Sequence, residues 1–148
     1  MINIISKLKN LCEKYKIEIL YLFGSQSDKG VSFIKGAKIY IEETSDLDIG
    51  IIFKTLPVDR YEIYGALYLD LSILFEPFNI DLVFLQETEI LFQYEAIKGY
   101  LIYCNNENFC DKYEEMVMKK ASDISYKKIS FEKDFMEAIK DGYITIAD

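Results

Sequence analysis

Three short apolar runs, separated by longer amphipathic stretches, constrain the fold of this 148-residue chain most strongly. The runs are Glu18–Phe23 (EILYLF), Asp48–Phe53 (DIGIIF) and Ile80–Leu85 (IDLVFL), and each has the length and β-prone composition of a buried strand. Apolar residues at helical spacing follow the second run from Val58 to Phe75 and the third from Glu87 to Gly99. Strands alternating with helices predict an α/β (α+β) fold, in which helices flank a small mixed sheet.

The segment between the first two runs has a different pattern. Residues 26–45 contain two short stretches of strand-forming residues, Val31–Ile34 and Lys38–Glu42, which lie on either side of Lys35-Gly36. We interpret this segment as a hairpin-like excursion from the sheet.

Both ends of the chain are predicted to be helical. Apolar residues recur at helical spacing over the first 15 residues, and the chain from about Glu107 onward predicts one long helix or two shorter ones. Just before that segment, Tyr100–Cys104 predicts a short fourth strand. No repeat or flexible linker interrupts the sequence, so we expect one domain over residues 1–148, with an α/β core in 1–106 and a helical segment in 107–148.

The composition excludes several classes of function. The chain has 17 Lys and Arg against 25 Asp and Glu, a net charge of −8, so it would repel a nucleic-acid backbone and no direct nucleic-acid partner is expected. It contains no histidine, which removes Ser-His-Asp, Cys-His and HExxH sites, and its single arginine is Arg60. Any catalysis therefore rests on carboxylates, lysines, backbone amides and metal ions.

The cysteines and the hydropathy pattern indicate the cellular compartment of the protein. Cys12, Cys104 and Cys110 form no CxxC pair and are odd in number, which indicates free thiols in a reducing compartment. No apolar run approaches the roughly 18 residues of a membrane span. Lys7 and Lys9 stand within an amphipathic repeat that does not resemble a signal peptide. We expect a soluble, cytoplasmic protein with no membrane partner.

Gly24-Ser25 directly follows the first apolar run. A turn of this kind presents backbone N–H groups and a hydroxyl that can hold phosphate oxygens. Taken alone, the same dipeptide is also an ordinary turn, so it becomes informative only together with the carboxylates further along the chain.

Asp46 and Asp48 stand at the opening of the second run. Because side chains alternate along a strand, both carboxylates project to the same face. Two neighbouring carboxylates repel each other, and a divalent cation would neutralise them. The alternative is an acidic strand end that faces solvent.

Asp81 lies inside the third apolar run, where a carboxylate needs a partner such as a metal ion or a lysine. If this strand lies beside the one with Asp46 and Asp48, the three carboxylates meet. Three carboxylates can bridge two Mg²⁺ ions, with a triphosphate supplying further oxygens. This set of groups suits nucleotidyl transfer.

The order of these motifs resembles the nucleotidyltransferase superfamily that includes DNA polymerase beta. More narrowly, the chain is similar to the minimal nucleotidyltransferases, the MNT proteins that are paired with HEPN proteins in prokaryotic toxin–antitoxin modules. Leu91–Asn106 (LFQYEAIKGYLIYCNN) resembles the helix–strand segment of that family, and Phe109–Ile129 resembles its C-terminal helix. The resemblance covers nearly the whole chain and implies the nucleotidyltransferase fold.

The resemblance also implies a role for each motif residue. Gly24 and Ser25 would bind the triphosphate of ATP. Asp46 and Asp48 would be catalytic metal ligands, and Asp81 would be the third ligand of two Mg²⁺ ions and the general base.

The segment after Ser25 departs from the family. The paired aspartates follow Gly-Ser more closely in the family, whereas Gln26–Ser45 intervene here, and the loop is longer and poorer in positive charge. Lys29, Lys35 or Lys38 can supply charge for the phosphates, and Lys29 is included among the candidate nucleotide-binding residues.

By the same resemblance, the chain is expected to transfer AMP from ATP to a tyrosine of a partner HEPN toxin and so to act as the antitoxin. Its small size favours a macromolecular acceptor. Two alternatives stay open: a catalytically weak module that binds nucleotide or partner and neutralises the toxin by complex formation, and a transferase acting on a small molecule such as an aminoglycoside. A neighbouring gene for a small all-helical protein with an Arg-x₄₋₆-His motif would favour the antitoxin interpretations.

Overall fold

Four strands form one mixed sheet in the computed structural model, which describes residues 3–41 and 45–142. The strands are β1 (Ile17–Phe23), β2 (Leu47–Phe53), β3 (Ile80–Phe84) and β4 (Tyr100–Cys104), in the spatial order β3-β2-β1-β4. β1 pairs antiparallel with β2 and with β4, whereas β3 lies parallel to β2. The two central strands are buried on both faces, and only Glu18 in β1 and Asp48 in β2 are partly exposed.

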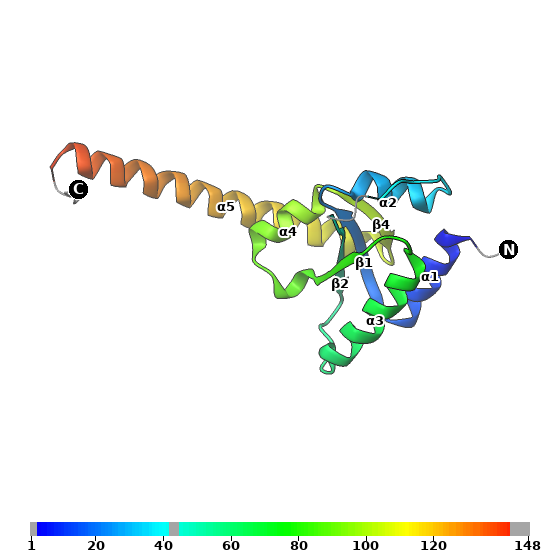
Figure 1. Ribbon diagram of the computed structural model, residues 1–148. Helices are drawn as coiled ribbons and strands as arrows, with labels where there is room; N and C mark the ends of the chain where they lie inside the picture. The colour runs from blue at the N-terminus through cyan, green and yellow to red at the C-terminus, as the bar shows by residue number, and fades with distance from the viewer. Residues whose placement is uncertain (1–2, 42–44, 143–148) are drawn as a thin grey trace.

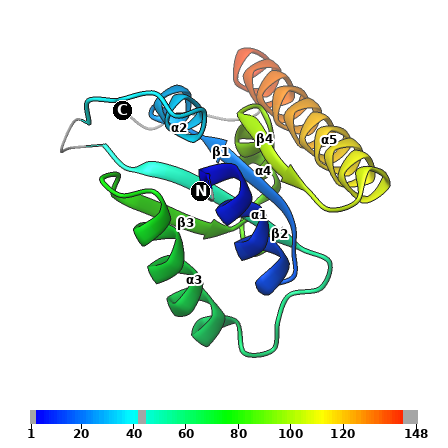
Figure 2. The same cartoon turned by 90° about the vertical axis from the view of Figure 1, so that its right-hand side faces the viewer.

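Helices cover both faces of the sheet (Figures 1 and 2). They are α1 (Ile4–Lys14), α2 (Ser27–Ile34), α3 (Arg60–Leu74), α4 (Ile90–Ile97) and α5 (Glu107–Lys140), with a 3₁₀ turn at Leu85–Glu87. α1, α2 and α3 lie on one face, and α4 and the first half of α5 lie on the other. α3 is the crossover that joins β2 to the parallel strand β3, as a parallel pair requires.

The alternation of side chains along β2 and β3 divides the core into two layers. Leu47 and Ile49 of β2 and Leu82 of β3 pack with α1 and α3, whereas Ile52 packs with α4 and α5. Asp48 alternates with Leu47 and Ile49 and therefore projects to the face that carries α4 and α5. The alternation along β2 thus places the Asp48 carboxyl group on the opposite face of the sheet from the apolar side chains that pack with α1 and α3.

The sequence-based expectations for fold class are confirmed. All four strands lie within one residue of their predicted bounds, and the sheet is mixed and flanked by helices. The predicted helices are also present, although the Val58–Phe75 and Glu87–Gly99 helices are shorter than expected. The C-terminal segment, predicted as one helix or two, forms the single helix α5.

The prediction of a hairpin in residues 26–45 is wrong. Residues 27–34 form helix α2, residues 35–41 form no strand, and residues 42–44 lie outside the described residues. Short apolar runs such as Val31–Ile34 do not distinguish a strand from a helix. Packing against the sheet selects the helix here. A Cβ at Gly30 would lie only 2.8 Å from Leu47 Cδ1 and 3.0 Å from Leu22 Cδ1, so the backbone of α2 lies close against the sheet at this glycine.

The expectation of three free thiols is also wrong. Cys104 at the end of β4 and Cys110 in the first turn of α5 form a disulfide, with Cα atoms 6.6 Å apart. A separation of six residues across a strand–helix connection brings the two side chains together, which a search for CxxC pairs does not detect. Cys12 is free and buried, and burial raises the pKa of its thiol to about 12.

Within the described residues, no helix combines the length and apolar character needed to cross a membrane.

Candidate active site

Gly24 forms the turn at the end of β1, with a φ of +77°. A Cβ at this position would lie 2.1 Å from the Oδ2 atom of Asp48, so the backbone of the turn contacts that carboxyl group directly. Glycine is required here both by the left-handed backbone and by this close approach. The turn and the aspartate therefore form one structural unit.

Ser25 follows the turn and is exposed, and α2 begins two residues later, at Ser27. The first N–H groups of a helix lack partners within the helix and carry a partial positive charge. Lys29 lies in the same first turn of α2. The hydroxyl, the amides and the lysine are thus carried by one short segment beside Asp48, which suits an anion such as a phosphate.

Gln26 is part of this segment, although sequence reasoning did not single it out. Its side chain is buried, and its amide nitrogen donates a hydrogen bond of 3.4 Å to the Ser25 hydroxyl. Its Oε1 atom is buried without a hydrogen-bond partner among the described residues. A glutamine in a turn after a strand is ordinarily exposed, so nothing in the sequence pattern marked it.

Tyr100 connects β4 to the first turn of α2. Its hydroxyl donates a hydrogen bond to the Asp28 carboxylate, and this bond raises the pKa of the tyrosine. The contact fixes a negative charge in the turn that also holds Lys29. The sequence separation of 72 residues kept this pair out of any local motif.

Asp48 and Asp81 are neighbours across the sheet. Asp48 is paired with Phe23 of β1 on one side and with Asp81 of β3 on the other. The third strand thus lies beside the second, which is the condition under which these two carboxylates come together. Asp46 precedes β2 and is exposed.

The pKa of Asp48 is raised to about 6. Partial burial is the largest cause, followed by the charge and hydrogen bonding of Asp81 and then by the charge of Asp46. Asp46 therefore acts on Asp48 electrostatically, although it is not part of the strand. The structure thus pairs Asp48 with Asp81, whereas Asp46 influences Asp48 only through its charge.

The raised pKa of Asp48 makes stability depend on pH. The folded chain holds this proton more tightly than the unfolded chain does, so ionisation of Asp48 lowers stability as the pH rises from about 4 through 6. We expect Asp48→Asn to raise the melting temperature at pH 8 and to change it much less at pH 4. Thermal unfolding without divalent cations at both pH values measures this difference, and an equal change at the two pH values would contradict it.

The donor set of the cluster consists of carboxylate oxygens, which hard cations such as Mg²⁺ prefer. In the described parts of the chain, no three Asp, Glu or Cys side chains converge into a preformed ion site. The paired carboxyl groups of Asp48 and Asp81 fit a divalent cation, and the repulsion between them is what such an ion would relieve. Asp46, whose charge acts on Asp48, is the candidate for a third ligand.

The mixed sheet, the Gly-Ser turn and the carboxylate cluster define a nucleotidyltransferase domain. Residues 6–108, from α1 to the start of α5, match the family model described as "Polymerase beta, Nucleotidyltransferase". The chain belongs to this family.

Solved structures of similar fold include toxin–antitoxin proteins. A crystal structure of a toxin–antitoxin with AMP-PNP contains a chain with a TM-score of 0.61 and 17% identity, over 89% of this chain and 98% of that one. A tri-AMPylated HEPN toxin in complex with an MNT antitoxin, from Shewanella oneidensis, gives a TM-score of 0.57 and 16% identity, over 90% of this chain and 96% of that one. No curated protein matches the chain.

Proposed function

We propose that this protein transfers AMP from ATP to a tyrosine hydroxyl of a HEPN toxin and thereby acts as its antitoxin. The observation that carries the proposal is the row formed by the Gly24 turn, Asp48 and Asp81 across three adjacent strands. Membership of the nucleotidyltransferase family supports the reaction type. The likeness to proteins crystallised with AMP-PNP and with an AMPylated HEPN toxin supports the choice of nucleotide and acceptor.

The Gly24-Ser25 turn is the proposed cradle for the triphosphate. Amides of the turn and of the first turn of α2, together with the Ser25 hydroxyl, would donate hydrogen bonds to phosphate oxygens. Gln26 would hold the serine hydroxyl in position from its buried site. Lys29 would add a positive charge to the outer phosphates.

The carboxylate cluster is the proposed reaction centre. Asp46, Asp48 and Asp81 would hold two Mg²⁺ ions, which when bound would neutralise these carboxylates and offset the charge of the triphosphate. Asp81, which is exposed at the edge strand β3, would accept the proton of the tyrosine hydroxyl. The tyrosine oxygen would form a bond to the α-phosphorus as the bond to the bridging oxygen breaks, and pyrophosphate would leave.

Binding of Mg²⁺ should stabilise the fold by relieving repulsion in this cluster. We expect millimolar Mg²⁺ to raise the melting temperature of the parent chain at pH 8, and Asp46→Asn to weaken that rise. Differential scanning fluorimetry with and without ATP is the measurement. An unchanged melting temperature in the parent chain under both conditions would count heavily against a metal site.

The proposed function is tested by intact mass spectrometry of the product of the neighbouring gene after incubation with this protein, ATP and Mg²⁺. Mass steps of one AMP that are absent when Asp46→Asn, Asp48→Asn is used would support adenylyl transfer. Digestion would then locate the acceptor residue. If the product of the neighbouring gene stays unmodified after incubation with the folded protein, ATP and Mg²⁺, the proposed reaction is overturned.

Complex formation without turnover is a second candidate, favoured by the Asp28 carboxylate that Tyr100 holds in the first turn of α2. A fixed negative charge there opposes binding of a triphosphate. An unmodified partner that still co-purifies with the chain would support this second candidate.

A further inference from the structure

Helix α5 extends far beyond the body of the protein (Figure 1). It contains 34 residues, a length of about 51 Å at 1.5 Å per residue. Its buried residues, Cys110, Tyr113, Val117 and Ala121, all belong to the first half. None of the described residues after Ala121 is buried, and we refer to residues 122–140 as the arm.

The buried face of α5 continues along the arm as a largely exposed and mostly apolar stripe. Ile124, Phe131 and Phe135 lie on the same helical face as Val117 and Ala121, and Lys128 interrupts this apolar stripe between Ile124 and Phe131. Phe131 is 70% exposed, and its ring stacks on that of Phe135 with centroids 6.2 Å apart. A projecting helix with such a stripe is expected to bury it against another surface.

Positive and negative side chains are unevenly distributed over residues 119–141, at the outer part of α5 and its C-cap. The half near the body carries Lys119, Lys120, Lys127 and Lys128 against Asp123. The distal half carries Glu132, Asp134, Glu137 and Asp141 against Lys133 and Lys140. The near half is therefore positive and the far half negative, which is the charge pattern that pairs with itself when two helices run antiparallel.

We propose that the arm packs antiparallel against the arm of a second copy of this chain. With the two-fold axis near Phe131, the two phenylalanines meet at the centre and Ile124 faces the second copy near Ala138. Lys120 and Lys127 of one copy then lie beside Asp141 and Asp134 of the other, because these four residues recur every seven positions along one edge of the stripe. A pairing of this kind is isologous and closed, so it gives a dimer and not a filament.

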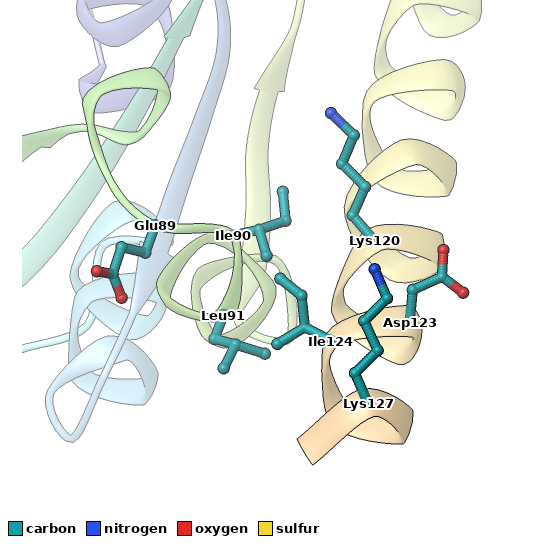
Figure 3. A pocket seen from close by; sticks show the side chains of 7 residues that line it. All are labelled: Glu89, Ile90, Leu91, Lys120, Asp123, Ile124 and Lys127. Atoms are coloured by element: carbon teal, nitrogen blue, oxygen red, sulfur yellow. The ribbon is translucent and has the colours of Figure 1, made fainter. Parts of the chain in front are cut away.

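A cavity at the base of the arm supports this pairing (Figure 3). It has a volume of about 560 Å³ and lies between α4 and α5, where Ile124 points toward Ile90 and Leu91 of α4. Lys120 and Lys127 line the same cavity. In the antiparallel pair, the acidic end of the second copy's arm would reach this cavity and place its carboxylates beside the two lysines.

Sedimentation equilibrium of the full chain, without nucleotide or toxin, tests the proposal independently of adenylyl transfer. We expect a mass of twice 17.3 kDa and a shift to the monomer in Phe131→Lys. The residue is exposed on the arm, so the domain should remain folded, which circular dichroism checks. A parent chain that stays monomeric up to about 100 µM would overturn the proposal, whatever other protein it binds.

A charge exchange tests the antiparallel register. Lys120→Glu, Lys127→Glu and, separately, Asp134→Lys, Asp141→Lys should each weaken self-association by roughly tenfold or more, because like charges then face each other. Mixing the two variants restores both sets of opposite charges and should restore the dimer. The matched control Lys7→Glu, Lys9→Glu on α1 should associate like the parent. A mixture that stays as dissociated as its components would overturn the antiparallel arrangement.

Discussion

Asp48→Asn is expected to lower the rate of adenylyl transfer by about 10³-fold or more while the domain stays folded. The substitution keeps the shape of the side chain but removes the carboxylate that lies against the Gly24 turn and beside Asp81. Without that charge, the proposed site loses the group that connects the triphosphate cradle to the proposed base. Single-turnover rates, followed as AMP mass steps on the partner protein, measure the loss.

The matched control for this variant is Asp111→Asn. Asp111 is an exposed carboxylate on α5, so its replacement makes the same chemical change outside the cluster. The control should transfer AMP at the parent rate. If Asp48→Asn retained more than a tenth of the parent rate, the reaction centre would have to lie elsewhere in the chain. The Gly24 turn, Asp48 and Asp81 would then have no role in catalysis.

The sequence predicted that Asp48 and Asp81 belong to two strands, and it made their meeting conditional on those strands being neighbours, which the structure shows. Alternation along a strand determines the face of each carboxylate, and a helix between two strands favours a parallel neighbour. The register that pairs Asp48 with Asp81 follows once both strands are in place. Asp46 was expected to project to the same face as Asp48 by strand alternation, but it precedes the strand, since pairing begins at Leu47.

The features that the sequence did not predict depend on contacts between distant residues. Helix α2 was expected to be a hairpin because Val31–Ile34 is β-prone, and its close packing against Leu22 and Leu47 through Gly30 has no local signal. Burial of Gln26 and the bond between Tyr100 and Asp28 likewise arise only when β1, β4 and α2 meet. Local propensity identifies elements, whereas these contacts depend on how the elements pack.

Gly24→Ala is expected to reduce adenylyl transfer by about 100-fold, because the new methyl group cannot coexist with the present position of the Asp48 carboxyl. A Cβ would lie 2.1 Å from Oδ2, so either the turn or the carboxylate must move. Either movement separates the proposed phosphate cradle from the proposed reaction centre. Rates are measured under the conditions used for Asp48→Asn, and stability is measured by urea unfolding.

Gly36→Ala separates this effect from backbone strain. Gly36 also has a positive φ, +92°, but a Cβ there would meet nothing within 4 Å. Both variants should lose about 1 kcal/mol from the left-handed backbone conformation, because an L side chain is disfavoured there. Only Gly24→Ala should also lose activity, since only its methyl group reaches a carboxylate. Equal activity in the two variants would mean that contact between the turn and Asp48 is structural, and that the triphosphate is held by some other part of the chain.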